Sequence, residues 1–564
     1  MGDATPMRGT TDRVSEEDSS RIEAGWADEA RASRELGAAR RRVRDLEQEV
    51  AALKEARRSQ AEQYETVLRS TSWRMTRPLR ALVMLLRGQL PVAEIARRFG
   101  LPFGGGQARR KMRAAGGAPN AVAQGVEAQG ELAELAFPLP GRVAWTPELS
   151  GEAMTPLAAT VSVVIPTYNA GAEFHWLLRK LKAQKGLAGV EVVVVDSDST
   201  DGTAEAAEAA GCVVVRIPNS EFSHSHARNL GADAASGELL LFTVQDAYPV
   251  GDHWLYSLAR ALTAPILEEY RVSALSCSEF PRRDSEMFYN AGIDAHYRFL
   301  NCRECDRVGV LTGQAHEQLR AQGQLSDVAC LIPAKTFQAY RYEGRYAEDL
   351  MLGVRMIRDG HKLAMLNSVQ VIHSHNRPAH YHLKRTFVDV LFLIDNFPDF
   401  LVPYADNVTG ALAAGAALEE LVRHWGPGFG QDAGESLWAL SGRVRRLPLR
   451  ELKVPGPEVD FGLPALKDWI AEAIAAETHL GRPDAEVLRT MFADKLESIA
   501  DYAGGIYGGT DDHVGQEIAS AARKTLASTI GAQLAFLYLN HAETGPPELR
   551  SRMQALRDLM LAGV

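Results

Sequence analysis

The sequence predicts an α/β protein built on a doubly wound, mostly parallel sheet, preceded by a coiled-coil helix and followed by a helical C-terminal domain. Short β-branched runs alternate with segments of helical length in residues 161–405, and no such run recurs in residues 406–564. A seven-residue apolar repeat near the N-terminus predicts the coiled coil. A chain of 564 residues, 46% of them apolar, is long enough for several domains with buried cores.

Residues 1–28 are expected to be disordered, and residues 29–100 to hold the coiled coil and a basic amphipathic segment. The apolar repeat has two rows, which are Leu36, Val43 and Val50, and Ala39, Leu46 and Leu53. The repeat favours a homodimer, although Arg57 at the next position leaves an intramolecular helical hairpin open. Residues 101–160, rich in Ala, Gly and Gln, are expected to form a linker.

The charge is divided between a basic arm and an acidic body. Residues 31–114 contain 20 Lys and Arg against 8 Asp and Glu, whereas the whole chain carries −10. Such an arm suits anionic lipid, nucleic acid or the body itself, and a solvated Arg-rich coiled coil explains the charge as well. The apolar run 81–86 between arginines fits a helix in a membrane interface or one packed on the body. Residues 69–113 are therefore a candidate contact with an anionic membrane.

Nucleic acid is disfavoured as a partner, because the arm lacks interleaved aromatic residues and a reading-head motif. The chain has no apolar run of eighteen residues, and acidic residues near its start interrupt any signal-peptide pattern. Five cysteines spread over the chain fit a reducing compartment. These features predict a cytoplasmic protein, with a peripheral position on the inner face of the cell membrane if the basic arm binds lipid.

Four apolar runs predict the first strands of the sheet: residues 161–165, 190–195, 213–217 and 239–242. In such sheets ligands bind at the carboxyl ends of the strands, so the polar residues after the runs are candidates for the site. Tyr168 can stack on a base, Asp196 can accept a hydrogen bond from a base N–H, and Asp246 can hold a divalent cation. Asp201 is expected instead to cap the next helix.

Several segments in order resemble the family 2 nucleotide-sugar glycosyltransferases. They are VSVVIPTYN (161–169), VVDSDSTDGT (194–203), FSHSHARNLG (222–231), FTVQDAYP (242–249), AEDL with GVR (347–355) and VIHSH (371–375). The histidine cluster before Arg-Asn, followed by Gln-Asp-Ala, is similar to the rhamnosyltransferase-like branch. The resemblance covers about residues 161–400, under half of the chain.

The resemblance implies a GT-A fold over residues 161–405, with a nucleotide-binding half and an acceptor half. It implies inverting transfer of a sugar from a nucleoside-diphosphate sugar donor to a hydroxyl of a glycan or lipid-linked glycan acceptor, in polysaccharide synthesis for the cell envelope. The nucleotide-sugar site that it implies comprises Pro166, Tyr168, Asn169, Asp196, Asp198, His224, Arg228, Gln245 and Asp246. Arg228 would reach the nucleotide from a helix opened by residues 224–226.

The DxD metal motif of that family keeps one acid here, Asp246, because Val244 occupies the first position. A histidine from residues 373–375 can add a ligand, so Asp246, His373 and His375 are the expected ligands of Mn²⁺ or Mg²⁺. A cation there would stabilise the leaving diphosphate. The alternative is that Asp246 is only a turn residue.

The acceptor hydroxyl needs a base, and Asp349 is the candidate. Glu348 is expected to orient a loop or to bond the acceptor. Alternatively, the pair is a surface Glu-Asp that caps a helix. Because the first acid of the metal motif is missing, a second function class stays open: a catalytically inactive coiled-coil scaffold that carries a nucleotide-sugar-binding domain.

Two features that lie between the expected nucleotide-binding half and the acceptor half have a structural explanation as well as a functional one. Cys302 and Cys305, with His296 and His316 nearby, form a weak zinc motif, and two unligated thiols are the commoner case. Four aromatic residues can form a platform for a sugar ring or belong to the core. They are Phe288, Tyr289, Tyr297 and Phe299.

Overall fold

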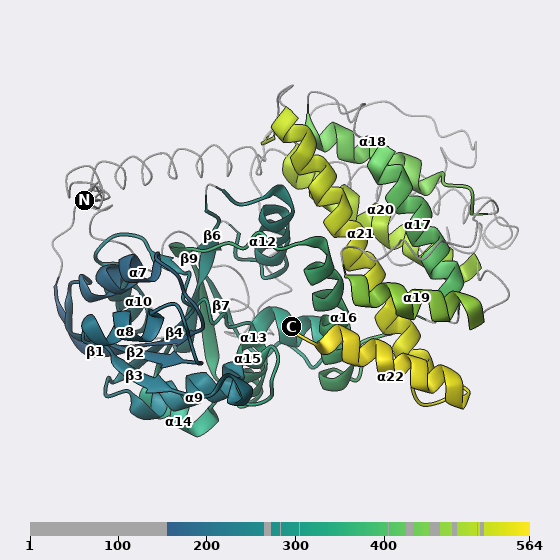
Figure 1. The fold of residues 1–564 in the computed structure, drawn as a ribbon. Coiled ribbons are helices and arrows are strands. Elements are labelled where there is room, and N and C mark those ends of the chain that lie inside the picture. Colours follow the sequence, from purple (N-terminus) through teal and green to yellow (C-terminus); the bar gives the residue numbers. More distant parts are fainter. Residues whose placement is uncertain are drawn as a thin grey trace, which may run out of the picture. The chain divides into compact units, whose positions relative to one another are not determined.

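The computed structural model describes residues 155–263, 272–282, 284–303, 305–403, 405, 407–424, 432–449, 463–476, 482–504, 506–507 and 512–563 (Figure 1). All of them belong to residues 129–564, the second of the two units into which the chain divides. The expected disordered N-terminus, coiled coil and basic segment therefore lie outside the described residues, as does most of the linker. Its last residues belong to the sheet, whose first strand begins at Leu157. Within the described ranges, no helix combines the length and the apolar character needed to cross a bilayer.

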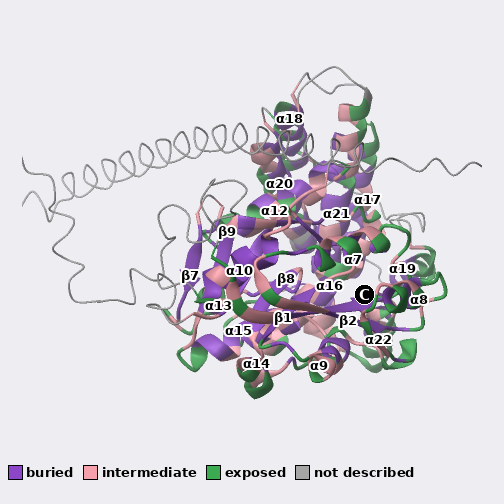
Figure 2. Cartoon of the chain, turned by 90° about the vertical axis from the view of Figure 1, so that its left-hand side faces the viewer, coloured by how far each residue is buried: buried purple, intermediate pink, exposed green. Residues whose placement is uncertain are grey.

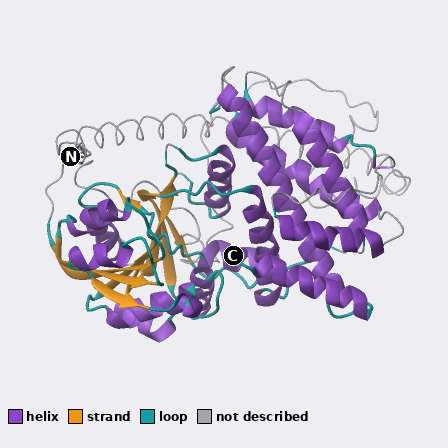
Figure 3. Ribbon diagram, viewed as in Figure 1, coloured by secondary structure: helices purple, strands orange, loops and turns teal. Residues whose placement is uncertain are grey.

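The described strands form one nine-stranded sheet (Figure 3). They are β1 (Leu157–Thr167), β2 (Leu187–Asp196), β3 (Val213–Arg216), β4 (Leu239–Thr243), β5 (Tyr248–Pro249), β6 (Val272–Phe280), β7 (Arg307–Gly309), β8 (Ala329–Pro333) and β9 (Lys362–Ile372). Their order is β3-β2-β1-β4-β8-β6-β9-β5, and β7 pairs with β9 outside this path. The four apolar runs predicted as strands are confirmed as β1 to β4.

The first half of the sheet is parallel and the second half is mixed. β3, β2, β1 and β4 run in one direction, as predicted. β8 runs antiparallel to both β4 and β6, because the chain reaches β8 from the edge at which β4 and β6 end. β9 is again parallel to β6, and the short strands β5 and β7 pair with it in the antiparallel sense. Six of the nine strands, β1 to β4, β6 and β9, therefore share one direction, so the sheet is mostly parallel as predicted, and β5, β7 and β8 run antiparallel to their neighbours.

Helices cover both faces of the sheet. They are α7 (Phe174–Lys182), α8 (Thr203–Ala209), α9 (His224–Ala234), α10 (Trp254–Thr263), α12 (Met287–Phe299), α13 (His316–Gly323), α14 (Ala334–Tyr340) and α15 (Glu348–Arg358). Successive residues of a strand point to opposite faces. Val163 and Ile165 accordingly pack against α7, α8 and α10, while Val164 packs in the core that contains α13, α14 and α15. Burial on both faces explains the continuous apolar runs at the ends of β1 and β2 and in β4, whereas β3, at the sheet edge, is only partly buried; buried residues are purple in Figure 2.

The described elements after residue 407 are all helices, in agreement with the sequence. They follow α16 (Ala379–Asn396) and are α17 (Val408–His424), α18 (Ala433–Arg445), α19 (Pro464–Ala476), α20 (Arg482–Ala503), α21 (Asp512–His541) and α22 (Pro547–Leu561). Their apolar core also takes in Met287 and Ala291 of α12 and Leu383 and Phe387 of α16. The helical packing therefore begins before residue 406, within the segment that follows the sheet strands.

Candidate active site

The topology brings the polar segments singled out in the sequence to one edge of the sheet. β1, β2, β4, β6 and β9 all run in the same sense, so their carboxyl ends meet at that edge, where ligands bind in α/β sheets. Tyr168 follows β1, Asp246 follows β4 and His373 follows β9. The antiparallel strand β8 begins at the same edge, just after Asp327.

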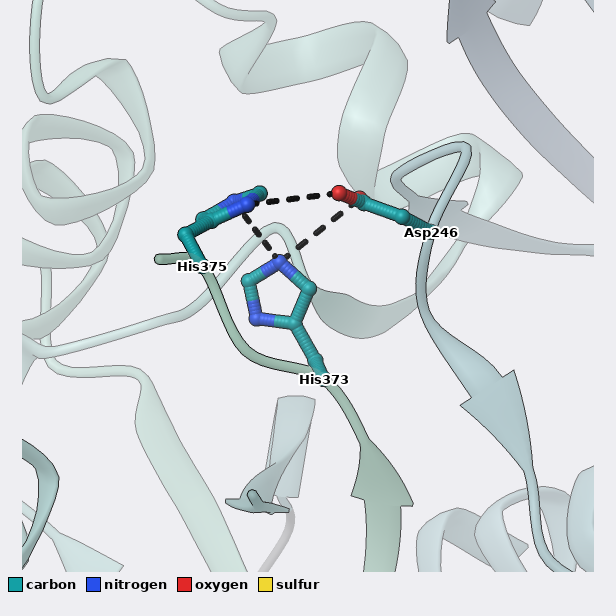
Figure 4. A group of neighbouring side chains, drawn as sticks. All are labelled: Asp246, His373 and His375. Atoms are coloured by element: carbon teal, nitrogen blue, oxygen red, sulfur yellow. Dashed lines mark hydrogen bonds and ion pairs between the residues drawn. The ribbon is translucent and has the colours of Figure 1, made fainter. Parts of the chain in front are cut away.

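Asp246, His373 and His375 form a compact cluster there (Figure 4). One ligand atom from each lies within 4.8 Å of the others, and no other group of this kind occurs among the described residues. Nε2 of His373 lies 3.6 Å from Oδ1 of Asp246 and 3.0 Å from Nε2 of His375. Nδ1 of His375 lies 3.4 Å from Oδ2 of Asp246. The structure thus brings together all three residues expected as metal ligands.

The buried carboxylate of Glu279, near the end of β6, holds His373 in place. Its Oε2 lies 2.7 Å from Nδ1 of His373 and accepts a hydrogen bond of 2.8 Å from the hydroxyl of Tyr289. Burial lowers the pKa of His373, but the hydrogen bond and charge of Glu279 more than offset this, and the pKa of His373 is raised. The pKa of His375 is lowered, by burial and by the charge of His373. Glu279 therefore orients one ring of the cluster.

A second, acidic cluster surrounds Arg228 at the same edge. The guanidinium of Arg228 is 3% exposed and lies 2.6 Å from Oε1 of Glu348 and 3.2 Å from Oδ2 of Asp327. The hydroxyl of Tyr342 donates a hydrogen bond to Asp327. Arg228 was expected to reach the nucleotide, and the structure places it instead beneath the acidic pair of α15. The reason is electrostatic: a buried guanidinium requires carboxylate partners.

Asp349 lies beside this cluster, and its Oδ2 accepts a hydrogen bond of 3.3 Å from the backbone N–H of Asp327. Burial and the neighbouring charge of Glu348 raise the pKa of Asp349 to about 6, while Arg228 opposes the rise. The residue before the acidic pair, Ala347, has a left-handed backbone with φ of 47°. Such strain in a residue with a side chain persists where the surrounding structure fixes it, often at functional sites.

Residues of α16 lie near the acidic cluster, and Tyr346 donates a hydrogen bond to Asp389 of this helix. Burial lowers the pKa of Arg385, but the charge of Asp389 more than offsets this, and the pKa of Arg385 is raised. The charge of Asp349 also raises the pKa of Arg385. The guanidinium of Arg385 lies 4.6 Å from the ring of Tyr346. Arg385 of α16 thus lies beside Tyr346, two residues before the acidic pair of α15.

The residues expected to bind the nucleotide lie at the ends of β1 and β2. Tyr168 is 50% exposed, and its backbone N–H and carbonyl are held by the side-chain amide of Gln245 at 2.9 and 3.2 Å. The carboxylate of Asp196 is buried and accepts hydrogen bonds from Thr167 and Ser199. Tyr168 is therefore presented to solvent by a fixed backbone.

The other expected nucleotide contacts occupy loops or the sheet interior. Asn169 and Asp198 have left-handed backbones at exposed loop positions, and Asp198 accepts the N–H of Asn219. Pro166 is buried within β1. His224 is exposed and opens α9, within electrostatic range of Glu348. Asp201, expected to cap a helix, accepts the N–H of Thr203 at the start of α8.

The weak zinc motif does not assemble among the described residues. Cys302 is buried and donates to the carbonyl of Met365, and neither cysteine joins a metal-type cluster. The four aromatic residues of α12 do not form a platform either, because they point to different surroundings. Phe288 packs against the helical core, Tyr297 is buried, and the ring of Phe299 contacts Arg320, which leaves Tyr289 at the site.

Three further residues of the site were missed in the sequence: Glu279, Asp327 and Tyr342. Each lies in a segment without a distinctive local motif and reaches the site only through strand order. Glu279 is the last polar residue of β6, a strand that the sequence analysis did not predict, so a search limited to the ends of predicted strands would have missed it.

The fold is an α/β sheet flanked by helices, and its polar and acidic clusters gather at the carboxyl edge of the strands. Residues 162–267 match the family model "Glycosyl transferase family 2", so this part of the chain is similar to the family 2 glycosyltransferases. Two O-antigen chain rhamnosyltransferases, from Salmonella typhimurium and Salmonella anatum, are each 24% identical to it over 240 and 245 residues. Each match covers 40% of this chain and 70% of the relative.

Solved structures also resemble the chain. A mannosyltransferase from Pyrobaculum calidifontis, in complex with GDP-Man and Mn²⁺, is 19% identical with a TM-score of 0.31, over 66% of this chain and 89% of that chain. A glucosyl-3-phosphoglycerate synthase from Mycobacterium tuberculosis is 21% identical with a TM-score of 0.30, over 43% of this chain and 80% of that chain.

Proposed function

We propose that the protein transfers a sugar, with inversion, from a nucleoside-diphosphate sugar to a hydroxyl of an acceptor, with a divalent cation held by Asp246, His373 and His375. The observation that carries the proposal is the position of this cluster at the same sheet edge as Asp349. A cation site and a base are the two groups that such a transfer needs.

The three side chains fit a divalent cation. One ligand atom from each side chain lies within 4.8 Å of the other two, so all three are near enough to share one ion. Two imidazoles beside one carboxylate favour Mn²⁺ over Mg²⁺. When bound, the cation stabilises the negative charge that develops on the leaving diphosphate. Glu279 fixes the tautomer of His373 so that Nε2 faces the cluster.

Asp349 is the proposed base that accepts the proton of the acceptor hydroxyl. Its raised pKa makes it a stronger base than an ordinary aspartate, and it is still ionised at neutral pH. Glu348 is bound to Arg228 and is not free to attack the sugar. One free carboxylate supports a single displacement, which inverts the configuration of the sugar. Glu348 then acts as a positioning residue, because it fixes Arg228 and the start of α15.

The donor is proposed to bind with its base on the ring of Tyr168. Gln245 fixes the backbone of Tyr168 and directly precedes Asp246, so the base site and the cation site are joined by a rigid contact. Asn169, Asp196, Asp198 and His224 are proposed to surround the nucleoside and the sugar. Rhamnose is the donor sugar to test first, since the two curated relatives are rhamnosyltransferases. A growing polysaccharide or lipid-linked glycan is the proposed acceptor.

Membrane docking through residues 69–113, dimerisation through the coiled coil and a cytoplasmic location at the inner face of the cell membrane are further proposals. They rest on sequence composition alone, because residues 1–154 lie outside the described part of the chain. Binding of the full chain to anionic and to neutral vesicles tests the docking, and sedimentation of the full chain tests the dimer.

Hydrolysis of a panel of nucleotide sugars, with and without Mn²⁺, tests the proposed reaction. The expected result is Mn²⁺-dependent hydrolysis of at least one rhamnose donor, lost in Asp349→Asn while nucleotide binding is retained. Binding of a nucleotide sugar with no turnover, in the presence of acceptor glycans, would favour the inactive scaffold. No binding of any panel member would refute the proposal.

A further inference from the structure

We propose that Lys524 of α21 is a positioning residue for the cation site, and that a role of the helical C-terminal part is to hold the histidine-bearing segment 373–376 in place. This inference deepens the proposed function and rests on it only for the identity of the site. The argument follows one continuous path of contacts from α21 to His375.

The first part of the path is the pairing of segment 373–376 with the loop that follows β6. The backbone N–H of His373 donates to the carbonyl of Phe280 at 3.0 Å, and the N–H of Arg282 donates to Oγ of Ser374 at 3.3 Å. The side chain of Asn376 bonds the same loop twice. Its Nδ2 donates to the carbonyl of Asp284 at 2.6 Å, and its Oδ1 accepts the N–H of Glu286 at 3.1 Å. Asn376 directly follows His375, so the position of the loop determines the position of the ligand.

The second part is the attachment of that loop to α21. The carboxylate of Glu286 forms an ion pair with Nζ of Lys524 and accepts a hydrogen bond from Ser520, and both of its partners come from α21. One residue further on, the N–H of Met287 donates to Oε2 of Glu517 at 2.8 Å. Residues 517, 520 and 524 are spaced by three and four positions, so they share one face of the helix. The loop is therefore held at its end by one helix face.

The ion pair is the strongest element of this attachment. Glu286 is 9% exposed and Lys524 is 8% exposed, so each charge depends on the other in a region with little water. Oε1 of Glu286 has no hydrogen-bond partner among the described residues. Removal of Lys524 would leave a buried carboxylate with only Ser520 as a partner, and Glu286 would have to move towards water. The contact of its backbone N–H with Asn376 would then be weakened.

The helix that supplies Lys524 is itself well fixed. Ile518, Ala521 and Ala522 of α21 are buried in the core of the C-terminal helices, and that core includes Met287, next to Glu286 in the chain. Asn290 of α12 donates to the hydroxyl of Tyr507 at 2.8 Å, which adds a further contact from the same part of the chain. The C-terminal helices therefore support the end of this loop, whose start is bound through Arg282 to Glu173.

Hydrogen exchange over residues 371–378 of the full chain, read by mass spectrometry without metal or sugar, tests this support. In Lys524→Met we expect about tenfold faster exchange in this segment, because local opening becomes easier. Lys524→Arg keeps a cation within reach of Glu286 and should restore the slow exchange. Arg445→Met is the matched control, because it removes another ion pair of the helical part, with Asp494 and Glu497, away from the loop. Exchange over 371–378 should not change in this control.

If Lys524→Met does not fold, the double variant Lys524→Met with Glu286→Gln removes both charges at similar volume and preserves folding. Unchanged exchange over residues 371–378 in the folded variants would overturn the proposal, as would an equal increase in Arg445→Met. A titration with Mn²⁺ alone provides a second readout, in which Lys524→Met should bind about tenfold more weakly. Absence of Mn²⁺ binding by the unaltered protein would count against the proposed function, whereas the exchange result does not depend on a metal.

Discussion

Oε2 of Glu279 lies 2.7 Å from Nδ1 of His373, and this contact determines which nitrogen of the ring faces the cluster. With Nδ1 engaged by the carboxylate, Nε2 is directed towards Asp246 and His375, as Figure 4 shows. A carboxylate behind a histidine ligand also increases the basicity of the ring. The residue that orients the proposed ligand thus comes from β6, more than ninety residues away in the chain.

Glu279→Gln should weaken Mn²⁺ binding about 10- to 100-fold, because the neutral amide orients and polarises His373 less strongly. Titration with Mn²⁺, monitored by electron paramagnetic resonance, measures the change. Glu191→Gln is a suitable control, since Glu191 is a partly buried carboxylate bonded to Ser162 and Ser236 near the opposite end of the strands. Equal Mn²⁺ affinity in Glu279→Gln and the unaltered protein would contradict the proposed orientation.

The fall of kcat/KM at acidic pH should follow the protonation of Asp349. Because the pKa of Asp349 is raised to about 6, the ionised form is lost as the pH falls through 6, and kcat/KM should decline below that pH and level off above it. Asp349→Asn should reduce the rate by about 10²- to 10⁴-fold above pH 6, by a smaller factor at lower pH where Asp349 is protonated in the unaltered protein, and should leave nucleotide affinity unchanged. A profile that stays flat down to pH 4.5 would exclude Asp349 as the base.

Arg228→Met should act on both stability and pH dependence. Removal of the buried guanidinium leaves Asp327 and Glu348 without their cation, which we expect to lower the free energy of unfolding by about 3–5 kcal/mol. Since Arg228 lowers the pKa of Asp349, its loss should also move the acid limb of the profile to higher pH. Urea denaturation and the pH profile measure the two effects. Arg216→Met, which removes an exposed pair, should leave both unchanged.

Tyr168→Ala should weaken nucleotide binding by about 1–3 kcal/mol, the usual contribution of one stacked base. Calorimetric titration with free nucleoside diphosphates measures the loss. Trp438→Ala, which removes another exposed aromatic ring on α18, is the control and should bind nucleotide normally. If both variants bind equally well, the base does not stack on Tyr168.

The sequence predicted those elements whose burial in the fold produces a regular pattern of apolar residues along the chain. β1, β2 and β4 could be predicted because their apolar residues are buried on both faces, which requires uninterrupted apolar runs, whereas β3 is a half-buried edge strand that was predicted from its valines. The candidate residues Asp246, His373 and His375 could be named because they lie within segments that resemble a known family. β6 and β9 were not predicted, since their strands contain polar residues and their pairing joins segments about ninety residues apart.

The sequence did not reveal the partners of Arg228. The resemblance implied that this arginine reaches the nucleotide from α9, and it said nothing of the carboxylates beside it. Its partner Glu348 is 120 residues away, and no helical or strand periodicity connects the two. The arginine is buried by the packing of α9 against the region that carries Asp327 and α15, which is a property of the whole domain.

The sequence by itself determined the class of the protein, its first four strands, the helical nature of its C-terminal part and the chemical types of residue at the site. Only the tertiary structure decided which of those residues meet, because strand order and helix packing bring together side chains that are far apart in the chain. These contacts are the hydrogen bond of Glu279 with His373, the ion pairs of Arg228 with Asp327 and Glu348, and the ion pair of Lys524 with Glu286 in the loop beside His375. Local patterns record burial and periodicity, whereas these contacts depend on long-range packing.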